Sequence, residues 1–93
     1  MRIGLCTIDI EVLDSFSLKE KRSVVLSLLA KIRASYNVSV AEVGKLNSVR
    51  YAQLAIVSVN TEGSHLNSTL ASVVTFIESD LRVKVINFNT ELI

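Results

Sequence analysis

The chain has 93 residues, enough for one domain and too few for two. Hydrophobic residues make up 49% of it, but the longest stretch without a formal charge is the 15 polar-containing residues 63–77, too short for a membrane-spanning helix. The single cysteine, Cys6, excludes an internal disulfide and a cysteine cluster for zinc. We therefore expect one cytoplasmic domain, residues 1–93, without a membrane segment or a metal site.

The net charge of +1 hides an uneven distribution of charge along the chain. Residues 17–50 contain seven Lys and Arg against two Glu, a net charge of +5, whereas the remainder contains three Lys and Arg against seven Asp and Glu, a net charge of −4. Asymmetry of this kind bears on binding partners rather than on the fold. The mean hydropathy of +0.45 is high for so small a domain, and it predicts more apolar surface than one thin core can bury.

Residues 3–13 alternate between two faces, which predicts a long strand with one fully apolar face made of Cys6, Ile8, Ile10 and Val12. Ser17 and Glu20 then match a capping box, so a helix should begin at Leu18 and run to about Ser35. Its apolar residues recur at helical spacing: Leu18, Val25, Leu28, Leu29 and Ile32. Asn37 is expected to end this helix in a left-handed conformation.

Two further strands should follow the first helix. Val38, Val40 and Val43 indicate the second strand, which Gly44 and the polar residues 45–50 interrupt. Residues 51–60 are apolar on both faces, so we expect the third strand in the centre of the sheet.

The last third of the chain predicts a second helix and a fourth strand. Residues 61–64 form a loop with two cap-type side chains, and an apolar stripe at helical spacing follows, made of Leu66, Leu70, Val73, Val74 and Ile77. Residues 82–92 have strand-like composition, but the apolar residues change faces near Val85, which a β-bulge there would explain.

The resulting order is βαββαβ, an α+β arrangement that predicts a ferredoxin-like fold with a four-stranded antiparallel sheet and two helices on one face. The helices should pack on the face that bears Cys6 and Ile8. The other sheet face has no helix to cover it, and it carries Ile3 and Leu5. We therefore expect a homo-oligomer, formed either by stacking of these faces or by pairing of edge strands.

Three strings also resemble the signature of the uncharacterised bacterial YlxP-like family: S-L-K-E-K-R at the first helix, N-V-S-V-A-E-V at the second strand and F-I-E in the second helix. The resemblance covers nearly the whole chain. It implies a ferredoxin-like fold and, from the usual gene neighbourhood beside translation initiation factor 2 and ribosome-binding factor A, a link to ribosomes or RNA. Members of the family often carry His and aromatic residues between the second and third strands. In this chain residues 44–50 contain neither, so a role tied to such residues does not carry over.

An enzyme would have to use one histidine, one cysteine and scattered carboxylates. His65 has no acid, cysteine or second histidine near it in sequence, and a polar helix-start residue is the better interpretation. Asp9 and Glu11 share a strand face, where solvated side chains are commoner than a catalytic pair. With no glycine-rich phosphate loop, and Gly63 before a helix as only a weak anion signal, we predict neither a catalytic residue nor a cofactor.

Basic residues in and after the first helix are the strongest functional signal: Lys19, Lys21, Arg22, Lys45 and Arg50. They predict contact with phosphate, without base readout because aromatic residues are scarce. Joined to the translation context that the resemblance implies, they suggest ribosomal RNA or a ribosomal particle as the partner. The alternative for these residues is a solvated helix face. Three functions remain open: an RNA-associated accessory protein, a self-assembling interaction module, and a small-molecule-binding or enzymatic domain, for which support is weakest.

Overall fold

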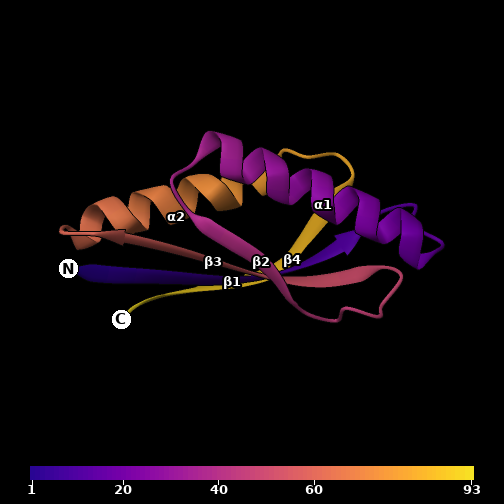
Figure 1. Ribbon diagram of the computed structural model, residues 1–93, viewed down its shortest axis with the longest axis horizontal. Coiled ribbons are helices and arrows are strands. Elements are labelled where there is room, and N and C mark those ends of the chain that lie inside the picture. The colour runs from indigo at the N-terminus through magenta and orange to yellow at the C-terminus, as the bar shows by residue number, and fades with distance from the viewer.

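The computed structural model describes residues 1–93 and confirms the βαββαβ order (Figure 1). The elements are β1 (Arg2–Val12), α1 (Leu18–Ser35), β2 (Ser39–Gly44), β3 (Tyr51–Asn60), α2 (Gly63–Glu78) and β4 (Val83–Leu92). No helix is both long and apolar enough to span a membrane.

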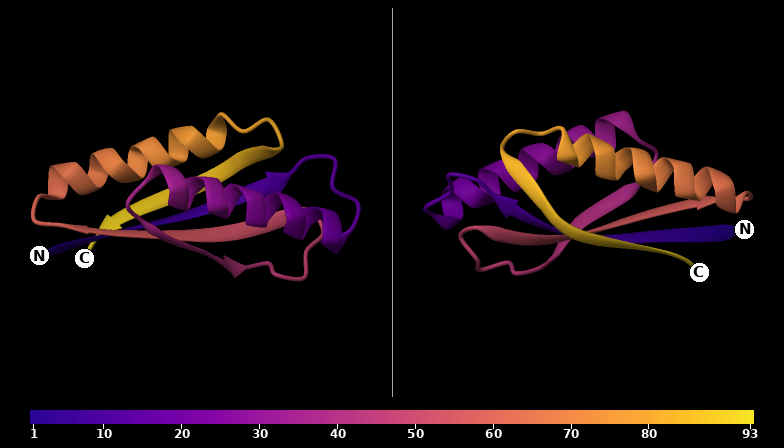
Figure 2. Two further views of the ribbon diagram at one scale, coloured as in Figure 1. Left: turned by 45° about the horizontal axis from the view of Figure 1, so that its top comes forward. Right: turned by 180° about the vertical axis from the view of Figure 1, so that it is seen from behind.

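The four strands form one antiparallel sheet in the order β2-β3-β1-β4, the topology of a ferredoxin-like fold. Both helices lie on the same face of the sheet (Figures 1 and 2). Helix α1 contacts β2 and β1, and α2 contacts β1, β3 and β4. The two chain termini lie close together at one end of the molecule (Figure 1), where Ile3 and Ile93 exchange backbone hydrogen bonds.

The core lies between the helices and the apolar face of β1, as the alternation of residues 3–13 predicts. All twelve side chains expected there are buried: Cys6, Ile8, Ile10, Val12, Val25, Leu28, Leu29, Ile32, Leu66, Leu70, Val73 and Ile77. Gly4 continues this face, and a Cβ at this position would lie 2.9 Å from Leu70 Cδ1. Glycine there lets α2 approach the sheet closely.

The bulge expected near Val85 is confirmed. Asp9 is opposite Asn87 and Ile10 is opposite Val85, so Ile86 is the extra residue of β4. It explains why apolar residues change faces within one strand.

The expected capping box at the start of α1 is confirmed, whereas the expected end of α1 and the expected side-chain cap of α2 are wrong. Ser17 Oγ accepts a hydrogen bond from the Glu20 N–H at 3.1 Å, as in a capping box. Asn37 does not adopt a left-handed conformation, because Tyr36 is already extended (φ −136°, ψ 147°) and the chain turns directly towards β2. Helix α2 begins at Gly63 with Glu62 as its N-cap residue and without a side-chain cap hydrogen bond, so neither cap-type side chain of residues 61–64 caps it.

Cys6 is fully buried, and burial raises the pKa of its thiol. Thiolate is the reactive form, so we expect iodoacetamide to leave the folded protein unmodified and to label Cys6 fully in urea, as measured by intact mass. Rapid labelling of the folded protein would contradict this position of Cys6.

Candidate nucleic-acid interface

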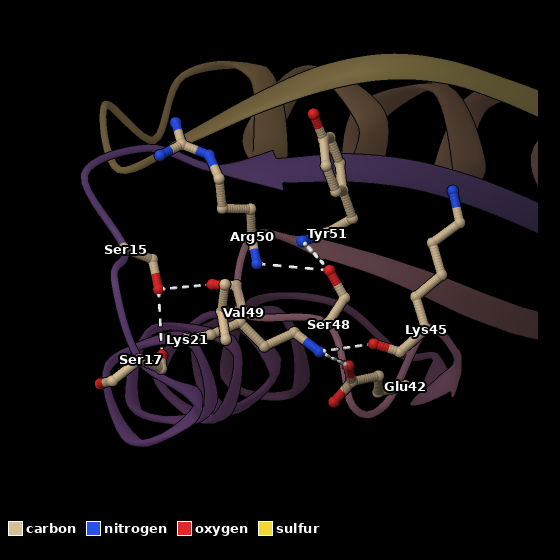
Figure 3. A network of polar contacts seen from close by, with 9 residues as sticks. All are labelled: Ser15, Ser17, Lys21, Glu42, Lys45, Ser48, Val49, Arg50 and Tyr51. Carbon is tan, nitrogen blue, oxygen red and sulfur yellow. Dashed lines mark hydrogen bonds and ion pairs between the residues drawn. The ribbon is translucent and has the colours of Figure 1, made fainter.

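Lys21 is buried rather than exposed, and this corrects its expected place in a basic surface. Its side chain is 0% exposed, and its Nζ donates to Glu42 Oε2 at 2.6 Å and to the Lys45 carbonyl at 3.0 Å (Figure 3). Lys21 follows Lys19 by two positions, or about 200° around a helix. It therefore lies on the side of α1 that faces the sheet, whereas Lys19 lies on the exposed side. Its ammonium group is ion-paired with Glu42 inside the protein and is not accessible to an external phosphate.

The loop of residues 45–50 is tied to the start of α1 by the same network (Figure 3). The buried Ser15 hydroxyl contacts the carbonyls of Val49 at 2.6 Å and Ser17 at 3.2 Å. Lys45 adopts a left-handed conformation with φ 59°, and the Lys21 ammonium holds its carbonyl. The segment between β2 and β3 is therefore held by contacts across the fold.

Arg50 and Lys45 extend away from Lys21, on the side of Tyr51 (Figure 3). Arg50 is ion-paired with Glu11, whose Oε2 accepts from Nε at 3.2 Å and from Nη2 at 2.9 Å. Lys45 Nζ lies 5.8 Å from the centroid of the Tyr51 ring, within cation–π range. The structure therefore does not bring the five predicted basic residues together as one surface.

Lys19 and Arg22 are exposed, and neither belongs to any of the three ion pairs in the structure. Arg33 shares these properties, and sequence reasoning missed it. Residues 19, 22, 26 and 33 lie within about 60° around a helix, so they form one stripe about 21 Å long. We call Lys19, Arg22, Leu26 and Arg33 the outer stripe of α1.

Arg33 is the most fixed member of the outer stripe. Its Nη2 donates to the carbonyl of Val40 in β2 at 2.8 Å, which anchors one side of the guanidinium and leaves other N–H groups free. Lys31 lies on another side of α1. The Arg82 side-chain hydrogen bond lowers the pKa of the Asp80 carboxyl, and the charge of Lys31 lowers it further. No acidic side chain interrupts the outer stripe.

The remaining candidate residues do not form a site. His65 is exposed in the first turn of α2. Glu11 is paired with Arg50, whereas Asp9 Oδ1 is buried without a hydrogen-bond partner. No group of three or more His, Cys, Asp and Glu side chains comes together in a metal-binding arrangement.

Ile3 and Leu5 lie on the sheet face that carries no helix, opposite Val59 and Val57 of β3. Both are half-buried by their neighbours in the sheet, and Val59 is 56% exposed. We call this surface the open face of the sheet. Asp9 and Glu11 lie on this face towards the other end of β1, where Tyr51 is opposite Glu11.

The outer stripe can attract anions but has no group that would perform a reaction. Three cations spaced along one helix suit a row of phosphates better than a single small anion. Guanidinium groups also bind phosphate through two parallel N–H donors. The outer stripe is therefore the candidate surface for contacts with a phosphate backbone.

Comparisons with known proteins agree with the sequence resemblance. The family model described as "Protein of unknown function (DUF503)" matches residues 3–90. The chain is also 30% identical over 77 residues to the "Uncharacterized protein YlxP" of Bacillus subtilis (strain 168), covering 83% of this chain and 84% of that protein. The match includes both helices and nearly all of the sheet. The chain therefore belongs to the DUF503 family of proteins of unknown function.

Proposed function

We propose that this protein is an RNA-associated accessory protein that holds the phosphate backbone of structured RNA, such as ribosomal RNA, against the outer stripe of α1. The observation that carries the proposal is a row of three exposed cations, Lys19, Arg22 and Arg33, without a carboxylate partner. The proposal assigns no chemical reaction to the chain.

The position of the other charges supports this surface over the loop of residues 45–50. Lys21 and Arg50 already have carboxylate partners at 2.6 and 2.9 Å, so an RNA phosphate would have to compete with these carboxylates. The outer stripe has no such competition. Lys45 remains exposed but extends towards Tyr51, so it would contact only an RNA that reaches around the end of the molecule.

Phosphate contact without base reading fits the residues present. Aromatic side chains make up 5% of the chain, and the exposed stripe contains none. Stacking on bases and hydrogen bonds to base edges supply sequence specificity in single-stranded RNA. Binding should therefore depend on RNA shape and on salt rather than on sequence.

Charge reversal on the outer stripe tests this function. We expect Arg22→Glu to weaken binding to a fluorescently labelled, structured ribosomal RNA fragment by about tenfold, because one attraction to phosphate becomes a repulsion. Lys19→Glu combined with Arg22→Glu should remove measurable binding. Fluorescence anisotropy at low salt measures both effects.

Arg2→Glu is the matched control, because it makes the same change of charge next to the N-terminus, which lies at the opposite end of the fold from the start of α1 (Figure 1). It should reduce affinity by less than about threefold through the change in net charge alone. Equal losses in Arg2→Glu and Arg22→Glu would show that only net charge matters. No binding by the wild type at low salt would exclude the proposed function.

A further inference from the structure

The outer edge of β4 is a long backbone edge without the usual protection. The strand order leaves β4 paired with β1 alone, and it is the nearest strand in the right-hand view of Figure 2. Beyond the bulge at Ile86, residues 87–92 contain Glu91 as their one charge and no Lys, Arg or Pro. Natural sheets protect exposed edges with charges, prolines, bulges or short strands. We call residues 87–92 the β4 edge.

The other edge strand, β2, is better protected. It has six residues in all, against ten in β4, and the irregular pairing with β3 between Glu42 and Gly44 interrupts it near its end. Arg33 from α1 also occupies the outward carbonyl of Val40. The two edges of the sheet are thus unequal, and β4 is the open one.

The free backbone groups of the β4 edge can be assigned from its pairing with β1. Ile3 and Ile93 exchange both backbone hydrogen bonds, so they form a hydrogen-bonded pair of the antiparallel ladder. These pairs alternate along a strand. Phe88, Thr90 and Leu92 therefore direct their N–H and C=O groups away from β1.

Apart from Glu91, the side chains around this edge are apolar or uncharged. Ile86 is 48% exposed, Phe88 is 52% exposed and Leu92 is 36% exposed. Helix α2, which packs beside them on β4, contains no Asp, Glu, Lys or Arg from Gly63 to Ile77. This contrasts with α1 on the far side of the fold, where the exposed cations lie.

We propose that the β4 edge pairs antiparallel with the β4 edge of a second copy of this chain, forming a twofold dimer with one continuous eight-stranded sheet. One register places Thr90 opposite the partner's Thr90 and Phe88 opposite the partner's Leu92. Every outward N–H then meets an outward carbonyl. Glu91 is opposite the partner's Asn89, so no like charges face each other, and the exposed apolar side chains meet across the strands.

The dimer goes beyond the proposed RNA contact and does not depend on it. All four helices would lie on the same face of the joined sheet. The two α2 helices would lie next to the twofold axis, and the two outer stripes would lie at its far ends. Measuring mass without RNA separates the failure of the dimer from the failure of RNA binding.

Light scattering at high micromolar protein concentration tests the dimer. The wild type should show twice the 10.2 kDa mass of the chain. Thr90→Pro should reduce the mass to that of a monomer, because it removes an outward N–H without removing a hydrogen bond to β1. Thr90→Ala keeps this N–H and should remain dimeric. Circular dichroism confirms that each variant is folded.

Two further variants keep the test decisive if Thr90→Pro unfolds. Phe88→Asp retains the backbone but places a charge opposite the partner's apolar Leu92, and it should be monomeric. Ile3→Asp alters the open face and should remain dimeric. A monomeric wild type, a folded and dimeric Thr90→Pro or Phe88→Asp, or loss of the dimer in Ile3→Asp would each overturn the proposal.

Discussion

Lys21→Ala should destabilise the protein by about 3 to 5 kcal/mol, because it leaves the Glu42 carboxylate without its cation in a largely buried position. The Lys45 carbonyl also loses its ammonium donor, and a cavity remains where the lysine side chain was. A domain of this size is stable by only about 5 to 14 kcal/mol, so the loss is a large fraction of the total. Urea unfolding followed by circular dichroism measures the change.

Lys19→Ala is the matched control, since Lys19 is exposed on the same turn of α1 and should change stability by less than about 0.5 kcal/mol. The double variant Lys21→Met with Glu42→Leu should recover most of the loss, because apolar residues of similar volume often replace a buried ion pair at little cost. If Lys21→Ala cost less than about 1 kcal/mol, the Lys21 ammonium would be hydrated in solution and the buried pair would be wrong.

Leu29→Ala should cost about 2 to 5 kcal/mol, because Leu29 is only 5% exposed in the core between α1 and the sheet. Leu26 gives an internal comparison on the same helix. It is 65% exposed, so Leu26→Ala should change stability by less than about 0.5 kcal/mol. Similar losses in both variants, measured by urea titration, would show that the phase of α1 is wrong.

The fold could be predicted from the sequence because each element has a strong local pattern. The alternation around Cys6 and Ile8 marks the buried face of β1, and the Ser17–Glu20 capping box marks the start of α1. The bulge could be placed near Val85 because apolar residues change faces there. These patterns are formed by residues close together in the sequence, so they can be recognised without the tertiary structure.

The candidate site was harder to predict because it depends on contacts between distant residues. The burial of Lys21 has a local signal, since residues 21, 25, 28 and 32 follow one helical stripe and three of them are apolar. Its partner Glu42 is 21 positions away, and only the packing of α1 on β2 brings them together. The pairing of Arg50 with Glu11 likewise needs the register of β1 and β3, which places Glu11 opposite Tyr51.

Arg33 shows the opposite case, a residue that spacing alone could have found. It lies 14 positions after Lys19, nearly four helical turns, so the two side chains share a face. The net charge of +5 for residues 17–50 includes buried and ion-paired cations as well as exposed ones. Sorting them by helical phase separates the outer stripe from Lys21.

The dependence of RNA affinity on salt shows whether the outer stripe of α1 binds the phosphate backbone. Three phosphate contacts from Lys19, Arg22 and Arg33 predict that the logarithm of the association constant falls linearly with the logarithm of salt concentration, with a slope of about −2 to −3 per protein chain. Fluorescence anisotropy with a structured ribosomal RNA fragment, between about 50 and 200 mM salt, measures this slope. We expect a slope in that range for the wild type and a slope nearer zero for Arg22→Glu. A slope near zero for the wild type, or no binding at the lowest salt, would show that the outer stripe does not bind RNA phosphates.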